Sequence, residues 1–279
     1  MMTNDRHVDN VRRYYERNTA LFAHFGSRAS AGSVHRALWP TGVRSLDEAL
    51  RFSHRLVADE LHKISTIECV VDLGCGVGGA LLDLRPHLPS AAVLFGMTLS
   101  RAQALLAAQR TAGAAYIVEG NFLAVPLRSA SCDLVYSIEA FAHAPGAGVY
   151  LAEAARLLRS GGRLVLLDDT VARASASPVE ENLVAVFRIG WGVPSVLPVD
   201  ALAKSAAQHG LRLQRADDLT SWLRLRALPL QLIAPLLHWT RAWWRCDPVL
   251  AATAGSIALQ TLLAIGLIRY RCLVFERVE

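Results

Sequence analysis

The sequence predicts an α/β protein built on a doubly wound, mostly parallel sheet of seven strands. Short runs rich in Val, Ile and Leu alternate with helical patterns between residues 68 and 168. This alternation is typical of parallel strands joined by crossover helices. A glycine-rich loop over residues 74–79 directly follows the first run, and such loops present backbone N–H groups to a nucleotide-like ligand. The predicted sheet therefore carries a predicted ligand site.

Two helical segments precede the sheet. Apolar residues recur near helical spacing over residues 8–25, and a second helix is expected over residues 46–64. Asp47 and Glu48 lie in the first turn of the second helix, where acidic side chains favour a helix N-terminus. Residues 1–66 are therefore predicted to form an N-terminal helical cap, which packs on the core and closes the ligand site.

The core is expected over residues 67–172 and is completed by residues 198–218 and 269–279. Its predicted strands are residues 68–73, 91–96, 115–118, 132–138, 162–168, 211–217 and 270–277, and its predicted helices are residues 79–87, 99–112, 148–159 and 198–209. Ligands of such sheets bind beyond the carboxyl ends of the strands. The residues expected at those ends are Asp72, Thr98, Asn121, Phe122, Ile138, Glu139, Asp168 and Asp169.

Two insertions, residues 173–197 and 219–268, interrupt the core and are predicted to form a substrate lid. Residues 249–268 carry no charge and formally qualify as a membrane span. Polar residues dilute this segment, and a closing strand of the sheet follows it immediately. A buried lid helix is therefore expected instead of a span. Peripheral contact with a membrane through the Trp and Arg side chains of the lid stays open.

Composition narrows the classes of function. The net charge is +5 and 53% of the residues are hydrophobic, which favours an apolar pocket or surface. No run of Lys and Arg interleaved with aromatic residues indicates nucleic-acid binding. The five scattered cysteines lack metal-ligand spacing, so we predict free thiols and no metal site. Residues 1–13 lack the apolar stretch of a signal peptide, and a cytoplasmic protein of undetermined oligomeric state is expected.

Two cofactors compete for the glycine loop. Gly74, Gly76 and Gly79 satisfy the dinucleotide pattern G-x-G-x-x-G, which also needs an acidic residue about 20 positions further on for the ribose. The second predicted strand instead runs into Gly-Met-Thr-Leu without a carboxylate. Asp72, just before the loop, can hold the cationic methionine end of S-adenosylmethionine. The loop therefore favours S-adenosylmethionine as its ligand. A dinucleotide, as in an oxidoreductase, is a minor alternative, and a glycine-rich turn without any ligand is the simplest alternative.

Four segments carry a resemblance to a known family. These are VDLGCGVGG at residues 71–79, SIEAFAHAP at 137–145, RSGGRL at 159–164 and YYERNT at 14–19. With them the chain resembles the class I S-adenosylmethionine-dependent methyltransferases, in particular the sterol, tocopherol and prenyl-diphosphate C-methyltransferases. The resemblance implies a Rossmann-like methyltransferase core and S-adenosyl-L-methionine as cofactor.

The resemblance also implies a set of cofactor-binding residues. They are Asp72, Leu73, Gly74, Cys75, Gly76, Thr98, Leu99, Gln103, Asn121, Phe122 and Ile138. Two positions depart from the family pattern. Asn121 replaces an aspartate that accepts a hydrogen bond from the adenine, and its side-chain carbonyl can accept the same bond. Thr98 replaces a ribose-binding carboxylate, so Gln103 or the main chain is expected to bind the ribose.

The predicted reaction is C-methylation of a hydrophobic terpenoid or prenylated acceptor in secondary metabolism, because an apolar lid suits a lipophilic ligand. Methyl addition to an alkene leaves a carbocation. Glu139 is the expected base or counter-charge, and Tyr14 is expected to stabilise the cation by a cation–π contact. If the acceptor carried a diphosphate, Arg36 and the arginines of the cap would be available to it.

Two alternatives stay open at this stage. The first is O- or N-methylation of an aromatic or polyketide metabolite, in which His143 or Glu139 would remove a proton from the acceptor. The second is a protein of another class, which holds the cofactor without turnover.

Overall fold

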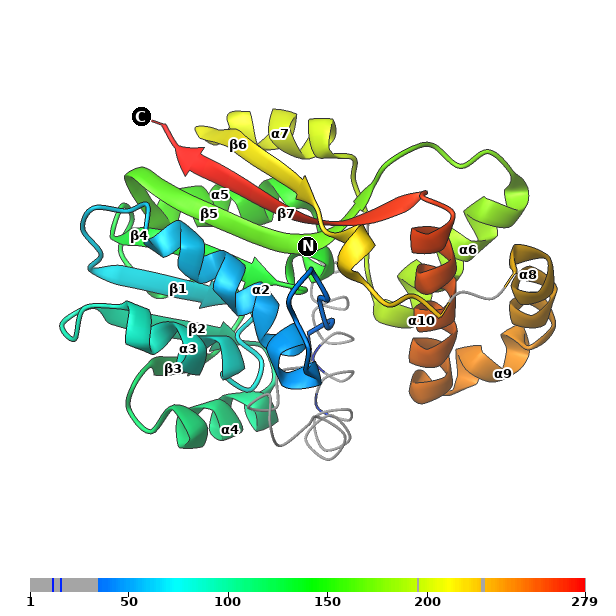
Figure 1. Ribbon diagram of the computed structural model, residues 1–279, viewed down its shortest axis with the longest axis horizontal. Helices are drawn as coiled ribbons and strands as arrows, with labels where there is room; N and C mark the ends of the chain where they lie inside the picture. The colour runs from blue at the N-terminus through cyan, green and yellow to red at the C-terminus, as the bar shows by residue number, and fades with distance from the viewer. Residues whose placement is uncertain (1–11, 13–15, 17–34, 195, 227–228, 279) are drawn as a thin grey trace.

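A seven-stranded sheet in the order β3-β2-β1-β4-β5-β7-β6 forms the centre of the computed structural model. Figure 1 shows the sheet with a group of helices beyond one end of it. The structure describes residues 12, 16, 35–194, 196–226 and 229–278. The predicted helix over residues 8–25, and with it Tyr14, lies outside the described residues apart from Arg12 and Glu16.

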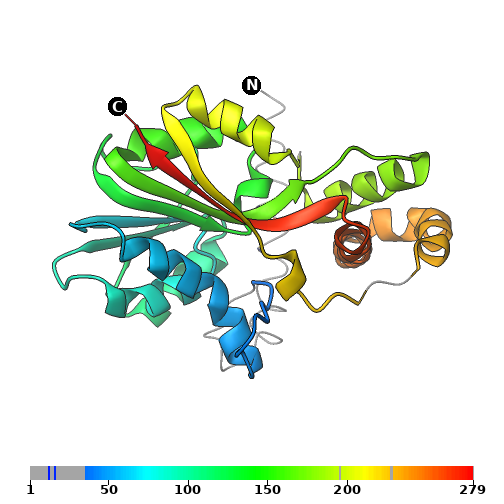
Figure 2. The same ribbon diagram turned by 45° about the horizontal axis from the view of Figure 1, so that its top comes forward.

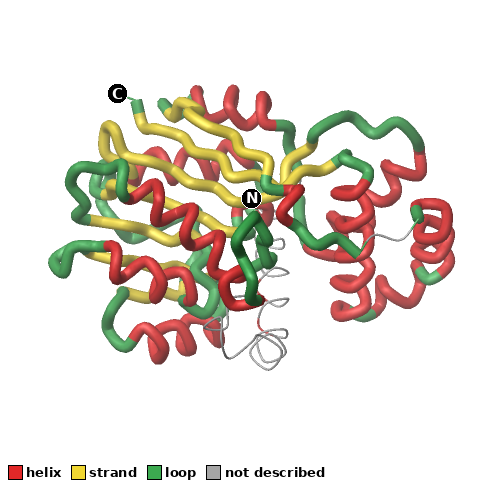
Figure 3. Tube along the Cα trace, in the orientation of Figure 1, coloured by secondary structure: helices red, strands yellow, loops and turns green. Residues whose placement is uncertain are grey.

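The elements follow the predicted alternation. The strands are β1 (Cys69–Leu73), β2 (Val93–Thr98), β3 (Tyr116–Glu119), β4 (Cys132–Ile138), β5 (Leu158–Val171), β6 (Leu211–Asp218) and β7 (Ile268–Arg277). The helices are α2 (Leu46–Leu61), α3 (Gly79–Leu84), α4 (Arg101–Thr111), α5 (Ala147–Leu157), α6 (Pro178–Trp191), α7 (Val199–Ala207), α8 (Leu230–Trp239), α9 (Arg241–Cys246) and α10 (Pro248–Ala264). Three 3₁₀ turns are η1 (Arg85–His87), η2 (Phe141–His143) and η3 (Thr220–Trp222). Figure 3 shows the same alternation of strands and helices along the chain.

The sheet is mixed, as predicted. Strands β1 to β5 pair in parallel, and β7 pairs antiparallel with both β5 and β6. β1 and β4 are buried along their whole lengths, which is why apolar residues occupy both faces of these strands instead of alternating with polar ones. Helices α2 and α3 cover one face of the sheet, and α5 and α7 cover the other (Figure 2). The carboxyl ends of the parallel strands consequently meet at one edge.

Strand β5 departs from the predicted bounds. It begins at Leu158, not at residue 162, and α5 ends correspondingly early at Leu157. The register between β4 and β5 shifts between Cys132 and Leu134. Extra residues in one strand form a bulge. Here the bulge contains Gly161, with a φ of +75°, and the Ser-Gly-Gly composition of this stretch predicts a turn.

Helix α2 begins at the predicted residue because its first turn is capped on both sides. Ser45 Oγ accepts a hydrogen bond from the N–H of Glu48 at 3.1 Å, and the Glu48 carboxylate accepts one from the N–H of Ser45 at 3.3 Å. This reciprocal capping satisfies two backbone donors that a helix leaves without partners. The helix then buries Val57 and Leu61 against the core.

Helices α6 and α8 to α10 lie beyond the sheet (Figure 1). The segment considered as a membrane span forms α10, which packs along α6 and buries Leu259, Leu262 and Leu263. The Trp191 Nε1 on α6 donates a hydrogen bond to Ser256 Oγ on α10 at 3.1 Å. Among the described residues, no helix is long and apolar enough to cross a membrane.

The close approach of α6 to α10 depends on Gly190. A Cβ at this position would lie 2.3 Å from the carbonyl oxygen of Ala251 and 2.7 Å from the Cα of Gly255. We expect Gly190→Ala to lower the free energy of unfolding by about 1–3 kcal/mol, because the helices must separate to admit the methyl group. The control is Gly148→Ala in α5, where the nearest atom, Ser205 Oγ, would be 3.7 Å away. Urea unfolding should show an unchanged or slightly higher stability for the control, and equal losses in both variants would contradict the packing argument.

Candidate functional site

The loop between β1 and α3 uses its glycines for two different reasons. Gly74, Gly76 and Gly78 all have positive φ, at +104°, +52° and +82°, a conformation that side chains with a Cβ rarely adopt. A Cβ at Gly74 would lie 2.3 Å from the Cβ of Ala140, so this glycine allows the loop to approach the end of β4. At Gly76 a Cβ would meet no atom within 4 Å, so this part of the loop faces open space. The loop therefore leaves room for a ligand against its backbone.

Two backbone bonds fix this loop to the neighbouring strand. The N–H groups of Gly74 and Cys75 both donate to the carbonyl oxygen of Met97 on β2, each at 2.9 Å. Leu73 is fully buried and Cys75 is nearly so. Both residues therefore hold the loop in place from beneath, and any contact that they make with a ligand is through their main chain.

Asp72 is a buried carboxylate directly before the loop, with 3% of its surface exposed. It lies beside Tyr136, its register partner on β4. Burial raises the pKa of Asp72 to about 7, because a carboxylate without water or a cation is poorly stabilised. No Lys or Arg of the described chain forms an ion pair with Asp72. A ligand cation at this position would relieve that cost, so the loop and Asp72 together fit the cationic methionine end of S-adenosylmethionine.

The residues predicted to bind the ribose are brought together at the end of β2. Thr98 Oγ1 donates a hydrogen bond to Gln103 Oε1 at 2.8 Å, and both side chains are buried. The Gln103 carbonyl is thus engaged, which leaves its amide N–H groups as the donors for a ligand hydroxyl. Half-buried Leu99 joins Thr98 to Ser100, the N-cap residue of α4.

Asn121 and Phe122 follow β3 at the same edge of the sheet. Asn121 Oδ1 accepts a hydrogen bond from the N–H of Leu123 at 3.0 Å, which makes a local turn. The second lone pair of this oxygen can still accept a bond from an adenine amino group. Phe122 packs edge-on against Tyr150, with ring centroids 5.3 Å apart. Ile138, at the end of β4, is buried.

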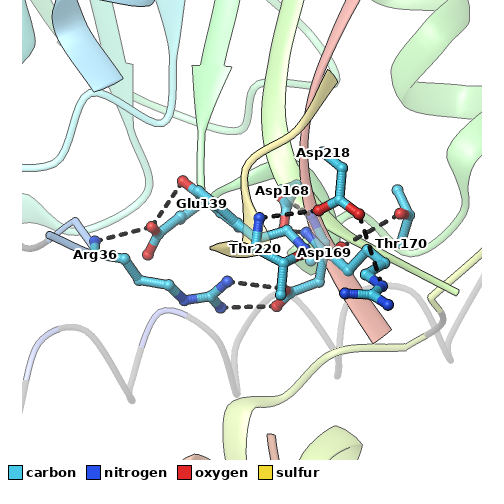
Figure 4. Close-up of polar contacts among 10 residues, drawn as sticks. Arg36, Glu139, Asp168, Asp169, Thr170, Asp218 and Thr220 are labelled. Atoms are coloured by element: carbon cyan, nitrogen blue, oxygen red, sulfur yellow. Dashed lines mark hydrogen bonds and ion pairs between the residues drawn. The ribbon is translucent and has the colours of Figure 1, made fainter. Parts of the chain in front are cut away.

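Glu139 follows β4 and is held by two long-range hydrogen bonds (Figure 4). Its Oε1 accepts from the N–H of Arg36 and from the hydroxyl of Tyr270, each at 2.9 Å. Burial raises the pKa of Glu139, while the nearby Arg36 lowers it to a smaller extent. The backbone of Glu139 has a φ of +55°, which costs an L-residue about 1–2 kcal/mol. Strain of this kind is retained at sites where the surrounding structure fixes a functional side chain.

The side chain of Arg36 is engaged by Asp169. The Nη1 and Nη2 atoms of Arg36 donate to the two carboxylate oxygens of Asp169, each at 2.7 Å (Figure 4). The guanidinium group also lies 4.7 Å from the ring centroid of Tyr270 and 5.5 Å from that of Trp191. Arg36, which the sequence offered as a partner for a diphosphate, is therefore an internal partner of Asp169 and Glu139.

Asp168, beside this pair, holds the turn that follows Glu139. Its Oδ2 accepts a hydrogen bond from the N–H of Ala142 at 2.9 Å. Burial raises the pKa of Asp168 to about 7, with a further contribution from the charge of Asp169. His143 ends the same turn, η2, and is 8% exposed. Its imidazole is thus a buried group close in the chain to Glu139.

Sequence reasoning missed two contributors to this edge of the sheet. Tyr270 lies on the last strand, and its N–H donates to Thr220 Oγ1 at 3.0 Å, which helps to orient the strand toward Glu139. Glu16 accepts hydrogen bonds from Ser100 Oγ at 3.0 Å and from the N–H of Arg101 at 2.7 Å, at the start of α4. The only sequence signal was the YYERNT block for Glu16, and Tyr270 had none.

The family comparison agrees with this geometry. Residues 71–166 match the protein family described as "Methyltransferase domain". This range contains Glu139 and the other strand-end residues of the site, with the exception of Asp168 and Asp169. The chain therefore carries a class I S-adenosylmethionine-dependent methyltransferase domain, and S-adenosylmethionine is the cofactor of this class. The predicted fold class and cofactor are both confirmed.

The chain is similar to sterol and prenyl-diphosphate methyltransferases. Over 215 aligned residues it is 32% identical to the 24-methylenesterol C-methyltransferase 2 of Oryza sativa subsp. japonica. The alignment covers 72% of this chain and 55% of the rice protein. The chain thus spans about half the length of the plant sterol methyltransferases that it matches.

Two solved structures share the fold. A geranyl diphosphate methyltransferase in complex with GPP and sinefungin superposes with a TM-score of 0.76 at 17% identity, over 98% of this chain and 100% of that one. The [4+2]-cyclase SpnF superposes with a TM-score of 0.71 at 19% identity, over 96% and 95%. At these identities the likeness concerns the fold alone, and the two proteins are named for different reactions.

Proposed function

We propose that the chain transfers the methyl group of S-adenosylmethionine to a carbon of a hydrophobic small molecule, namely a terpenoid or prenylated acceptor. The observation that carries this proposal is the position of Glu139. Its carboxylate lies at the strand edge that also contains Asp72 and the glycine loop, and Arg36 and Tyr270 hold it. A fixed, buried carboxylate with a raised pKa is suited to accept a proton from a reacting carbon.

In this proposal the cofactor is bound by Asp72 and by the loop N–H groups that are not bonded to Met97. Asn121 accepts from the adenine, and Gln103 donates to the ribose. When bound, S-adenosylmethionine supplies an electrophilic methyl group. The acceptor alkene would donate its π electrons to that methyl carbon, so that the new C–C bond forms as the S–C bond breaks and its electron pair stays on sulfur. A carbocation would remain on the neighbouring carbon of the acceptor. Glu139 then takes a proton from the adjacent carbon, and the C–H electrons restore a double bond.

The surroundings of Glu139 support a charged intermediate on the acceptor. The Arg36–Asp169 ion pair places two opposite charges beside Glu139 and therefore adds little net charge to the site. Burial raises the pKa of Tyr270, so its hydroxyl stays protonated and keeps donating to Glu139. The rings of Tyr270 and Trp191 already contact the Arg36 guanidinium, so the cation–π contact with the acceptor is assigned to Tyr14. His143 is assigned the role of a second proton acceptor.

The proposed acceptor is lipophilic because the helices beyond the sheet are strongly apolar. Helix α10 carries no charged residue, and α6 and α10 bury a common apolar face with Phe187, Leu259 and Leu262. The names of the sterol and geranyl diphosphate relatives point in the same direction. We assign residues 173–197 and 219–268 the role of a lid over this acceptor.

Calorimetric titration with S-adenosylmethionine, S-adenosylhomocysteine and NAD tests the first step. Micromolar binding of the first two without binding of NAD is expected, and binding of NAD alone would refute the assignment. Incubation with methyl-labelled S-adenosylmethionine and a panel of prenyl alkenes, phenols and amines then locates the label by mass spectrometry. Label on carbon supports the proposal, whereas label on oxygen or nitrogen supports the alternative. Cofactor binding without transfer to any acceptor would favour a non-methylating protein of this fold.

A further inference from the structure

The outer helices carry an unusual concentration of exposed apolar side chains. Of the 13 large hydrophobic residues that are exposed in the described part of the chain, six lie between residues 232 and 250. We call this group the α8–α9 patch, and its apolar members are Leu232, Leu236, Trp239, Trp243, Val249 and Leu250. Trp239 and Trp243 are the most exposed of all, at 86% and 75%. An apolar group of this size on a surface indicates an interaction.

The exposure of the patch is a consequence of how α8 and α9 pack. Leu232, Leu236 and Trp239 are spaced at intervals of four and three residues and therefore share one face of α8. A second face, about 100° around the helix, buries Ile233 and Leu237 in the core. Helix α8 is therefore apolar on both faces, although only one face has a partner within the described chain.

Trp244 fixes the neighbouring helix in the matching orientation. It is buried, and its Nε1 donates to the carbonyl oxygen of Leu237 at 2.9 Å. This bond ties α9 to α8 and leaves Trp243, the preceding residue, facing outward. Figure 1 shows both helices at the end of the molecule that is farthest from the sheet. The patch is thus separated from the edge that contains Glu139.

The charge of this region is one-sided. Residues 219–268 contain four arginines, no lysine, and Asp247 as the sole acidic residue. Asp247 caps α10, since its Oδ1 accepts from the N–H groups of Val249 and Leu250 at 2.8 and 2.9 Å. Arg241 and Arg245 are both exposed on α9, on either side of Trp243 in the sequence. At about 100° per residue, Arg241 and Arg245 share one face of α9 while Trp243 lies on another, so the region combines exposed tryptophans with an excess of positive charge.

We propose that the α8–α9 patch docks on an anionic membrane surface. Tryptophan rings are favoured at the level of lipid headgroups, where one part of the ring is wet and the other is apolar. The exposed arginines of the same region add contacts to lipid phosphates. A second copy of the chain fits less well, because a self-complementary interface would bring the arginines of both copies together. This docking does not depend on the proposed reaction. If the acceptor is a lipophilic molecule dissolved in the bilayer, docking would bring the protein to the membrane that contains it.

Sedimentation of the full chain with large unilamellar vesicles tests this proposal. One set of vesicles contains phosphatidylcholine alone, and the other contains about one-third phosphatidylglycerol. Binding to the anionic vesicles is expected for the unmodified protein and is expected to weaken with added salt. The double variants Trp239→Ala/Trp243→Ala and Arg241→Glu/Arg245→Glu should each lower the partition coefficient at least about tenfold.

Matched controls separate the patch from general surface effects. Leu105→Ala/Tyr116→Ala removes two side chains that are 58% and 68% exposed at the other end of the molecule. Arg128→Glu/Lys204→Glu makes the same charge change at two exposed positions outside the patch. Both controls should bind anionic vesicles like the unmodified protein. Equal losses in controls and patch variants, or no binding to anionic vesicles, would overturn the proposal.

Two further measurements distinguish docking on a membrane from contact between two copies of the chain. The affinity for S-adenosylmethionine and the unfolding temperature should be unchanged in the patch variants, and together they show that the variants are folded. Sedimentation velocity without vesicles should give the same species for the unmodified protein and for Trp239→Ala/Trp243→Ala. Self-association that is lost in this variant, without vesicle binding, would make the patch an interface between copies. Equal binding to neutral and anionic vesicles would contradict the role of Arg241 and Arg245.

Discussion

Replacing Glu139 by glutamine is expected to lower kcat for methyl transfer by about 10²- to 10⁴-fold, because the amide cannot accept the proton that the acceptor carbon releases. The dissociation constant for S-adenosylmethionine should change less than about threefold, since the proposed cofactor ligands are Asp72 and the loop and not Glu139. Single-turnover rates with labelled cofactor give the first quantity, and calorimetry gives the second. Unchanged turnover would remove Glu139 from the mechanism. An equal loss of cofactor affinity would make Glu139 a cofactor ligand.

The control for this variant is Glu153→Gln in α5. Glu153 is also largely buried, but it accepts from the N–H of Val125 at 2.7 Å and pairs with Arg156. Its loss should reduce stability and leave kcat nearly unchanged, so a loss of kcat in Glu139→Gln alone separates chemistry from folding.

Tyr270→Phe supplies a second readout on Glu139. The hydrogen bond from Tyr270 lowers the pKa of Glu139, so its removal should raise that pKa further. A base must be ionised to act, and kcat therefore rises with pH through the pKa of the base. The acidic limb of the kcat profile should move to higher pH in Tyr270→Phe. A uniform loss at all pH values would assign Tyr270 a packing role instead.

The second large effect is expected for Asp72→Asn. Removal of the carboxylate should weaken S-adenosylmethionine binding by about 30- to 1,000-fold, or about 2–4 kcal/mol, because the ligand cation loses its buried partner. The same substitution should stabilise the protein without cofactor. Burial raises the pKa of Asp72 to about 7, so the folded state binds a proton that the unfolded state has released.

The sign of the pH dependence follows from this raised pKa. A raised carboxyl pKa means that the stability of the cofactor-free protein falls as the pH rises from about 4 to about 7 and stays low above it. The amide that replaces the carboxyl group has no proton to lose, so this fall should be smaller in Asp72→Asn. Above pH 7 the variant should unfold at a higher temperature than the unmodified protein. Weaker binding together with lower stability at pH 8 would indicate that the substitution damages the fold.

Cofactor affinity should depend on pH in the opposite direction. The ligand cation requires ionised Asp72, so binding to the unmodified protein should be constant above about pH 7 and fall by up to about tenfold per pH unit below it. Asp168 also titrates near pH 7, and Asp72→Asn isolates the contribution of Asp72, since its affinity should lose this slope.

Asp133→Asn is the control for Asp72→Asn. Asp133 is equally buried but lies at the amino end of β4, where it accepts from the N–H groups of Glu68 and Cys69. Its loss should destabilise the protein and leave cofactor affinity unchanged. A loss of cofactor affinity in this control would contradict the assignment of the site to the carboxyl edge of the sheet.

Most of the fold was predictable because it depends on short-range chemistry. One run of residues predicts the bounds of β4, and Asp47 and Glu48 predict the start of α2. The alternation of strands and helices also places Asp72, Thr98, Asn121 and Glu139 at one edge of the sheet. Strand β5 was predicted to begin at residue 162, whereas pairing with β4 extends it back to Leu158 through a bulge.

By itself, the sequence determined the class of domain and the cofactor, and it predicted the edge of the sheet where the cofactor binds, because turn residues, strand ends and the glycine loop are read from neighbours in the chain. Only the tertiary structure decided what holds Glu139. Arg36 and Tyr270 lie 103 and 131 residues away from it in sequence, and no local pattern relates them. They meet Glu139 because β7 inserts beside β5 and the segment before α2 crosses the strand ends, and contacts of this kind depend on the packing of the whole chain.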